Sequence, residues 1–384
     1  MSDLSYLDRL LDGVQVEWKA LGEVAKYEQP TKYLVQSKNY SNDFEMPVLT
    51  AGKTFILGYT DETDGVYRAS KTPVIIFDDF TTANKWVDFD FKAKSSAMKM
   101  ISSSDESKVL SKYIYYWLNT LQNELVVGDH ARQWISNYSN KSFPTPPLHI
   151  QAEIVQILDN FAELTAELTA ELTARKKQYN YYRDQLLSFE DGEVEWKTLG
   201  EVAEYSKKRI SANQLDKTNY VGVDNLLQNR AGKAESIYVP TEGNLTEYRA
   251  GDILIGNIRP YLKKIWLSDR VGGTNGDVLV IHPTDENLNS RYLYQVLAYE
   301  KFFEYNMQHI KGAKMPRGNK DKIMEYRFPV PINPNKQARI VAILEKFDTL
   351  TSSITEGLPR EIELRQKQYE YYRELLLSFP KPTP

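Results

Sequence analysis

The chain has 384 residues, of which 41% are hydrophobic and 26% are charged, and its formal net charge at pH 7 is −4. This length allows two or three globular domains, while the lack of cysteine excludes disulfides and thiolate metal sites. No apolar run reaches the ~18 residues that a membrane span needs. Acidic residues near the N-terminus argue against a signal peptide. We therefore expect a soluble cytoplasmic protein with no membrane partner.

The sequence repeats its own framework. Three motifs recur in the same order: Val16–Tyr27 as Val194–Tyr205, Gln151–Phe161 as Gln337–Phe347, and Arg175–Phe189 as Arg365–Phe379. In each copy, about 120 unlike residues separate the first motif from the second. A repeated framework with divergent inserts predicts an internal pseudo-two-fold repeat, in which one scaffold carries two different recognition modules.

The first insert alternates short β-type runs with turns. Pro73–Phe77 and Trp86–Phe91 predict strands, and Lys112–Thr120 predicts a helix. The turn after the first strand and the segment His130–Asn137 carry polar and basic groups suited to DNA. We select seven candidate DNA-binding residues in this insert: Lys53, Thr81, Thr82, Asn84, Lys85, Arg132 and Gln133.

A long helix follows the first insert. Apolar residues recur every three or four positions from Ile150 to Leu187, which is the period of an amphipathic helix. Its middle, Ala162–Thr173, is the tetrad AELT three times over, and Ala, Glu and Leu are strong helix formers.

The second insert has a similar plan with different loops. Strands are predicted at Asp252–Ile258 and Asp277–Ile281, and a helix at Arg291–Tyr299. Its loops are basic and contain glycine, which lets the backbone approach a ligand. Eight candidate DNA-binding residues lie in them: Arg259, Tyr261, Lys263, Lys264, Asn275, Lys311, Lys314 and Arg317.

These candidates are chosen by loop chemistry. Lysine neutralises phosphates, whereas arginine and asparagine also read base edges. For any one of them, a solvated surface charge is the simpler alternative. However, Arg132 aligns with Arg317 at the offset of 185 residues (317 − 132) that relates the ends of the two inserts. Recurrence at equivalent positions favours a function.

A second long helical segment begins near Gln337, and Gly357-Leu358-Pro359 is expected to break it before it resumes. Two amphipathic helices in one chain most simply bury their apolar stripes against each other as an antiparallel coiled-coil spacer. The alternative is that each helix packs only on its own domain.

One pattern imitates a catalytic site. The acid/acid/lysine set of a metal-dependent nuclease occurs twice, as Asp12, Glu17 and Lys19 and as Asp191, Glu195 and Lys197. The tryptophans between them, Trp18 and Trp196, better fit structural joints that pack an indole. Phosphate-binding and dinucleotide-binding loops, the G-x-S-x-G motif and the N-P-P-[YF] motif are absent from the sequence.

The combination of motifs resembles the specificity (S) subunit of type I restriction–modification enzymes, in particular the IC-like group. The resemblance covers essentially the whole chain. It is carried by the duplicated Trp18 and Trp196 opening motifs, the segments Pro144–Val155 and Pro329–Val341, the AELT tandem, the YYRDQLLSF and YYRELLLSF helix ends, and the G-D-I-L-x-x-x-I-R-P stretch at Gly251–Pro260.

The resemblance implies a subunit that recognises double-stranded DNA and holds no cofactor. Two methylation (M) subunits would clamp around the helices, and two restriction (R) subunits would join the full complex. S-adenosylmethionine, ATP and Mg would belong to these partners, and each target-recognition domain would read one half of an asymmetric split site.

The expected fold is mixed α/β, with two α+β target-recognition domains joined by two long antiparallel helices. The predicted segments are an N-terminal helical segment that docks near the C-terminal helix (1–15), the first target-recognition domain (16–147), the central helix with the AELT repeats (148–190), the second target-recognition domain (191–334) and the C-terminal helix (335–384). Two other functions stay open from the residues alone, a protein-only adaptor and a metal-dependent nuclease.

Overall fold

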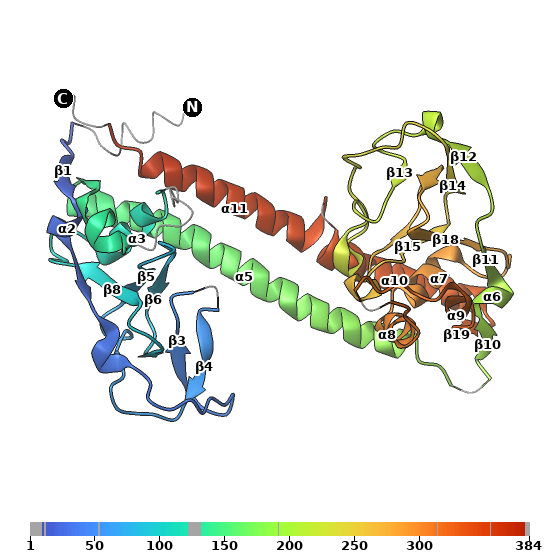
Figure 1. The fold of residues 1–384 in the computed structure, drawn as a ribbon, viewed down its shortest axis with the longest axis horizontal. Helices are drawn as coiled ribbons and strands as arrows, with labels where there is room; N and C mark the ends of the chain where they lie inside the picture. The colour runs from blue at the N-terminus through green and yellow to red at the C-terminus, as the bar shows by residue number, and fades with distance from the viewer. Residues whose placement is uncertain are drawn as a thin grey trace. The chain divides into compact units, whose positions relative to one another are not determined.

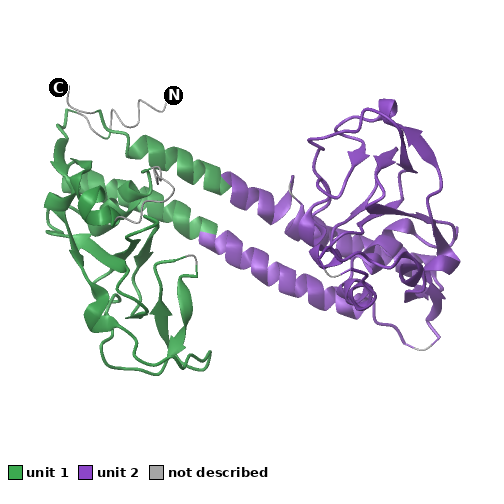
Figure 2. Cartoon of the chain, in the orientation of Figure 1, with its two compact units in different colours: residues 1–165, 365–384 green, residues 166–364 purple. Residues whose placement is uncertain are grey.

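A computed structural model describes Leu10 and residues 13–52, 54–121, 132–190, 192–312, 314–353 and 355–380. The chain divides into two compact units (Figure 2). Unit 1 comprises Met1–Thr165 and Arg365–Pro384, and unit 2 comprises Ala166–Leu364. Each unit therefore contains one insert together with parts of the long helices. The predicted segment 1–15 lies mostly outside the described residues; of these residues, Leu10 and Val14 pack on the cluster that contains Leu376.

Unit 1 has two sheets of three or four strands (Figure 1), besides one two-stranded sheet. The central sheet is antiparallel, in the order β2 (Ala25–Glu28), β8 (Met98–Ser103), β5 (Val74–Asp78) and β6 (Asn84–Val87). The second has the order β4 (Ile56–Thr60), β3 (Met46–Leu49) and β7 (Lys92–Ala93). Strand β5 is fully buried, as its unbroken apolar run predicts. The helices are α2 (Leu21–Val24), α3 (Ser111–Leu118) and α4 (Gln133–Ser136), with 3-10 turns η1 (Pro30–Tyr33) and η2 (Tyr138–Asn140).

Unit 2 has a central sheet of the same plan, in the order β11 (Ala203–Tyr205), β18 (Val278–Pro283), β15 (Ile253–Gly256) and β16 (Ile265–Leu267). Its second sheet has the order β12 (Arg209–Ser211), β14 (Asn244–Tyr248), β17 (Gly272–Thr274) and β13 (Tyr220–Val221). The helices are α6 (Leu199–Val202), α7 (Ser290–Leu297), α8 (Glu300–Gln308) and α9 (Lys320–Met324), with 3-10 turns η3 (Ala212–Gln214), η4 (Gln228–Arg230) and η5 (Pro260–Leu262).

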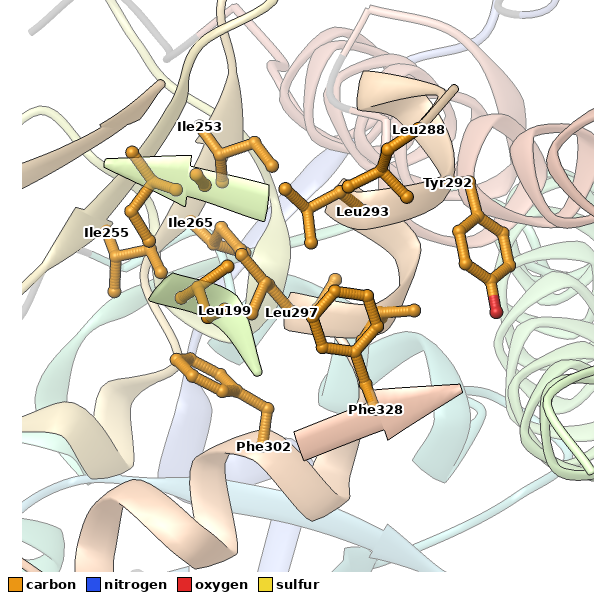
Figure 3. Packing of buried hydrophobic residues seen from close by; sticks show 14 of the residues in the cluster. Leu199, Ile253, Ile255, Ile265, Leu288, Tyr292, Leu293, Leu297, Phe302 and Phe328 are labelled. Carbon is orange, nitrogen blue, oxygen red and sulfur yellow. The ribbon is translucent and has the colours of Figure 1, made fainter. Parts of the chain in front are cut away.

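The apolar core of unit 2 lies between its central sheet and its helices. Figure 3 shows side chains of β15, β16, α7, α8 and β19 (Arg327–Pro331) gathered in one cluster, among them Ile253, Ile255, Ile265, Leu293, Leu297, Phe302 and Phe328. Helix α7 supplies apolar groups on one face, as the helical period of its sequence predicts.

The strand register confirms the internal repeat. Ile75 of β5 pairs with Ile101 of β8, and Ile253 of β15 pairs with Ile281 of β18. Residues of the first central strand therefore correspond to residues 178 positions later (253 − 75) in the second.

In each unit the opening motif pairs with the end of the insert. Strand β1 (Glu17–Ala20) sets Trp18 opposite Pro144 of β9 (Ser142–Thr145), and β10 (Val194–Thr198) sets Trp196 opposite Pro329 of β19. Trp18 packs on the apolar cluster of unit 1. Trp196 is 59% exposed, so the prediction that both tryptophans pack inside a joint is wrong for the second copy.

The long helices are α5 (Leu148–Leu186), α10 (Pro334–Ser352) and α11 (Gly357–Leu376). The predicted break in the second helical segment is present, but it precedes Gly357: α10 ends at Ser352, and α11 begins at Gly357. Pro359 falls in the first turn of α11, where a proline costs no helical hydrogen bond. Gly357 takes a positive φ of 75°, and an added Cβ there would meet the carbonyl oxygen of Thr349.

Contacts within each unit confirm that the helices run antiparallel. In unit 1, Phe161 of α5 stacks on Tyr372 of α11 with ring centroids 5.2 Å apart. In unit 2, Tyr182 of α5 stacks on Phe347 of α10 at 5.6 Å. The start of α5 thus meets the end of the second helical segment, and the end of α5 meets its beginning. Each helix also packs on its own domain, since Leu158 is fully buried in the core of unit 1.

Candidate nucleic-acid interface

Each insert is fastened to a long helix by the same buried glutamine. The Gln151 side chain donates to the Pro146 and Lys108 carbonyls (2.7 and 3.0 Å) and accepts from the Leu110 N–H (3.0 Å).

Gln337 makes the equivalent three bonds in unit 2, to Pro331 O, Asn287 O and Asn289 N (3.2, 3.1 and 2.9 Å). The two glutamines open the recurring Q-A-x-I-V motif, so their identity in both copies was the signal that marked them. Their hydrogen bonds join the loop before α3 or α7 to the start of α5 or α10, and so fix the position of each insert on its long helix.

In unit 1 the turn between β5 and β6, together with the start of β6, carries four of the seven predicted site residues. The Asp78 carboxylate accepts the backbone N–H groups of Phe80 (2.9 Å) and Thr81 (3.2 Å), which shapes the turn. Thr81 is exposed, but Thr82 is buried with a φ of 61° and donates its hydroxyl to the Thr81 carbonyl (2.7 Å). Thr82 therefore holds the backbone rather than facing a ligand. Phe80, which sequence reasoning did not select, is 41% exposed beside it.

Asn84 and Lys85, at the start of β6, have partners within unit 1. The Asn84 side chain accepts from the Asn119 amide at 3.1 Å. The Lys85 ammonium lies 4.4 Å from the centre of the Phe55 ring, a cation–π geometry that leaves the charge accessible. Phe55 belongs to the loop between β3 and β4; Lys53 in the same loop lies outside the described residues.

The structure joins the β5–β6 turn to the Arg132 segment, in which Trp134 lies 55 residues after Asp79. The Gln133 N–H donates to the Asp79 carbonyl (2.8 Å), and the Trp134 N–H donates to the Asp79 carboxylate (2.9 Å). Arg132 is exposed, whereas the Gln133 side chain is buried and accepts from Asn137. Thr81, Lys85 and Arg132 are therefore the accessible members of this set.

In unit 2 the loop between β15 and β16 is strained at both ends. Arg259 and Lys263 adopt left-handed φ values of 52° and 51°, which are uncommon for residues with a Cβ. Arg259 is exposed, and Tyr261 between them is 48% exposed.

Two lysines predicted to bind DNA have partners within unit 2. The Lys263 ammonium pairs with Glu300 at 2.5 Å, and the Lys264 ammonium donates to the Val223 carbonyl at 2.5 Å. Burial lowers the pKa of Lys264.

The remaining candidates of unit 2 lie on two neighbouring loops. Lys311 and Arg317 exchange backbone hydrogen bonds of 2.8 and 2.9 Å and so form an antiparallel bridge. The Arg317 guanidinium lies 3.3 Å from the Asp277 carboxylate, and Asn275 accepts the Asp277 N–H at 3.1 Å. Lys311 and Lys314 are exposed, and their ammonium groups have no partner among the described residues.

Backbone bonds bring these loops together with the β15–β16 loop. The Arg259 N–H donates to Pro316 O at 2.8 Å, and Ile258 and Arg317 form a β-bridge. The accessible set in unit 2 consists of Arg259, Tyr261, Asn275, Lys311, Lys314 and Arg317. Cationic and amide groups on converging loops can contact phosphates and base edges.

The described residues hold no group of three or more carboxylates and histidines with the geometry of a metal site. Glu17 forms an ion pair with Lys19 at 2.7 Å, and Lys197 lies between Glu195 (3.6 Å) and Asp285 (2.9 Å). Asp12 and Asp191 of the nuclease pattern lie outside the described residues. No described helix is both long and apolar enough to cross a lipid bilayer.

A family model described as the type I restriction modification DNA specificity domain matches residues 14–175 and 192–364. The chain belongs to this family. The specificity subunit of the Escherichia coli type I restriction enzyme EcoR124I/EcoR124II is 54% identical over 402 residues, covering 100% of this chain and 99% of that protein. A putative type I restriction enzyme specificity subunit of Haemophilus influenzae is 31% identical and covers 98% of each chain.

Solved structures confirm the fold of this specificity subunit. The crystal structure of the type I restriction–modification S subunit from M. genitalium matches with a TM-score of 0.66 at 15% identity, over 96% of this chain and 98% of that one. Family membership makes the chain the DNA specificity subunit of a type I restriction–modification system, which is non-catalytic and carries no cofactor itself. The protein-only adaptor and the nuclease are thereby set aside.

Proposed function

We propose that each unit of this specificity subunit reads one half of an asymmetric split site in double-stranded DNA. The first reading surface consists of Thr81, Lys85 and Arg132, together with Lys53 of the β3–β4 loop. The second reading surface consists of Arg259, Tyr261, Asn275, Lys311, Lys314 and Arg317. Of the other candidates, Thr82, Asn84, Gln133, Lys263 and Lys264 would shape these surfaces from beneath.

The observation that carries this proposal is an equivalence between two different loops. The backbone N–H of Gln133 donates to Asp79 O at 2.8 Å, and the N–H of Gly318 donates to Asn257 O at 3.1 Å. Since Asp79 and Asn257 each follow the central strand of their sheet, Arg132 and Arg317 occupy the same place in the two units. The groups around them differ, so two different half-sites are expected.

We further propose that two methylation subunits dock on the long helices. Tyr181 is 61% exposed and Tyr371 is 48% exposed. They lie at equivalent positions of the repeat, each next to the tyrosine that stacks across the helix pair. An aromatic patch that occurs twice on one chain fits two copies of one partner. Two restriction subunits would complete the assembly, and the partners would hold S-adenosylmethionine, ATP and Mg. The complex would work in the cytoplasm.

The test is single-molecule methylation sequencing of DNA from a host without other methylases that expresses this chain with a cognate methylation subunit. The expected result is an asymmetric methylated motif with a fixed spacer. Arg132→Ala should relax only one half of the motif and Arg317→Ala only the other. A methylated motif whose two halves both respond to one of these substitutions, or to neither, would contradict the assignment of one half-site to each unit.

A further inference from the structure

The residue after the central strand of unit 1 is the connection between the two segments of the first reading surface. Asp79 is buried, with 2% of its surface exposed. Its carbonyl accepts from Gln133 N (2.8 Å) and its carboxylate accepts from Trp134 N (2.9 Å). Arg132, directly before these two residues, is thus held beside the turn that carries Thr81.

The second oxygen of the same carboxylate faces a buried lysine. The Lys99 ammonium lies 3.6 Å from Asp79 Oδ2 and 4.6 Å from the centre of the Tyr27 ring. Only 1% of Lys99 is exposed, and its ammonium has no hydrogen-bond partner among the described residues. A buried charge pair is weak evidence for stability, because an apolar pair of similar volume often serves as well. The presence of this charge pair is better explained by a role in positioning the groups around it.

In unit 2 the residues equivalent to Asp79 and Lys99 are uncharged. Phe77 of β5 pairs with Lys99 of β8, and Ile255 of β15 pairs with Leu279 of β18. The counterpart of Lys99 is therefore Leu279, and the counterpart of Asp79 is Asn257, two residues after Ile255. Unit 2 has a neutral pair where unit 1 has a charged one.

The difference follows from the backbone. In unit 2 the Arg317 segment is bound to the β15–β16 loop by the bridge of Ile258 with Arg317 and by the bond from Arg259 N to Pro316 O. In the part of unit 1 that the structure describes, no such bridge joins the β5–β6 turn to the Arg132 segment. The side chain of Asp79 takes its place, and an ionised acceptor binds an N–H about twice as strongly as a neutral one.

We propose that the Asp79–Lys99 pair is a positioning element for recognition of the first half-site. It fixes where Arg132 meets the DNA, and it rests on the proposed reading of that half-site by unit 1. Lys99 holds the Oδ2 atom of Asp79 on the inner side, so that the Oδ1 atom points to the Trp134 N–H. The pair acts through Arg132 and does not itself touch DNA.

The second unit supplies the variants for the test. Asp79→Asn leaves the buried Lys99 without a counter-charge. Lys99→Leu leaves the buried Asp79 carboxylate without one. The double variant Asp79→Asn/Lys99→Leu reproduces the side chains that unit 2 carries at Asn257 and Leu279. It removes both buried charges while keeping an oxygen that accepts from Trp134.

The experiment uses the complex of the full chain with its methylation subunit, on a library of sites in which each half is randomised in turn. We expect each single variant to lower discrimination by about tenfold or more at the base pairs that Arg132→Ala affects, the loss typical of one misplaced base contact. The second half-site should be read as in the wild type. The double variant should recover part of the discrimination in the first half-site, because it removes the unpaired charge of the single variants but offers the Trp134 N–H a neutral, weaker acceptor.

Two outcomes would overturn the proposal. One is that the single variants lower the melting temperature of the complex but keep the wild-type selectivity for the first half-site. The other is that they relax base pairs that Arg132→Ala leaves unchanged. A different result, in which Arg132→Ala itself affects no base pair, would instead remove the reading role of this surface, so the two failures are distinguishable.

Discussion

The two units fasten their recognition domains to the helices with different polar groups. In unit 1, Asp159 of α5 pairs with Lys112 of α3 at 3.0 Å. In unit 2, Glu345 of α10 pairs with Arg291 of α7 at 2.6 Å. These pairs occupy equivalent positions of the repeat, at the second residue of α3 or α7. The outer ion pair has therefore been kept in both units.

Unit 2 has a second, buried network with no equivalent in the part of unit 1 that the structure describes. Arg183 of α5 is 1% exposed, lies 3.6 Å from the Asp348 carboxylate of α10, and donates to Gln295 Oε1 of α7 at 3.1 Å. Tyr179 also donates to Asp348, and the position of the repeat equivalent to Asp348 is Ala162. The equivalent of Arg183, Arg373, pairs only with its neighbour Glu374 among the ion pairs of the described residues.

Two near-identical motifs therefore make different contacts in the two units. Arg183 and Arg373 stand in the same place of YYRDQLLSF and YYRELLLSF, yet only Arg183 links both helices to a recognition domain. Burial lowers the pKa of Arg183 to about 10, which still leaves it protonated at neutral pH. Unit 2 is thus held by a buried charge whose loss should be costly, and unit 1 is not.

The largest effect is expected from changing the length of α5 between Leu158 and Tyr179. Leu164, Leu168 and Leu172 of the AELT tetrads are half-buried, and no residue of α5 between Leu158 and Tyr179 belongs to a fully buried core cluster. One tetrad advances a helix by ~6 Å and ~40°, close to the ~34–36° twist of one base pair. Deleting 166–169 should therefore shorten the recognised spacer by one base pair and leave both half-sites unchanged.

Methylation sequencing of the deletion variant measures this directly. Leu168→Met is the matched control, because it alters the tetrad without altering the length of the helix. An unchanged spacer in the deletion variant would show that the tetrads do not set the distance between the half-sites.

The next effect distinguishes the two arginines. Arg183→Met leaves the Asp348 carboxylate, which is 25% exposed, without its cationic partner. This should cost about 3 kcal/mol of the free energy of opening of unit 2, the lower end of the range for breaking a buried pair. Arg373→Met should cost no more than about 1 kcal/mol in unit 1. Hydrogen exchange of the α5 amides in each unit gives both values. The double variant Arg183→Met/Asp348→Leu should recover most of the loss, and equal effects of the two single variants would argue against the comparison.

These contrasts show what the sequence can and cannot predict. The period of apolar residues placed the central helix at 150–187, and the structure has it at 148–186. The apolar run 73–77 likewise marked β5, which spans 74–78. Local patterns succeed here because burial of one face or of a whole strand imposes them on the sequence.

The partners of the charged groups were not predictable in this way. From loop chemistry, Lys263 and Lys264 are predicted to bind phosphates. In the structure, their ammonium groups donate to the Glu300 carboxylate and the Val223 carbonyl, 37 and 41 residues away in sequence. Asp79 did not stand out, because its role depends on a segment 55 residues further on. Only the folded chain brings such groups together, whereas their loop chemistry alone matches a binding site.

A smaller effect tests which lysines of unit 2 face DNA. Lys311→Met should lower the slope of log affinity against log salt concentration by about one, because an exposed ammonium that neutralises a phosphate releases a counterion. Lys264→Met should leave that slope unchanged, since the ammonium of Lys264 already donates to the Val223 carbonyl. Binding of the methyltransferase complex to its site at several salt concentrations gives the slopes. Equal slopes for Lys311→Met and the wild type would remove Lys311 from the second reading surface.

The smallest effect concerns the acid stability of unit 1. Asp90 accepts from the Ser70 hydroxyl (2.7 Å), from the Arg68 guanidinium (2.8 Å) and from Ser70 N (3.1 Å). These bonds, that of the Ser70 hydroxyl first, lower the pKa of Asp90 to about 2. A carboxyl whose pKa is lower in the folded state stabilises the fold above its unfolded pKa of about 3.9. That contribution is lost as the pH falls through the folded value.

Asp90→Asn should therefore destabilise unit 1 at pH 7, by no more than about 1 kcal/mol for a pair at the surface. The difference from the wild type should shrink as the pH falls from about 4 towards 2. Asp88→Asn is the control, because it makes the same substitution at an exposed residue that has no partner in the described part of unit 1. Urea unfolding at a series of pH values measures both variants. A constant difference for Asp90→Asn would mean that its hydrogen bonds do not depend on its charge.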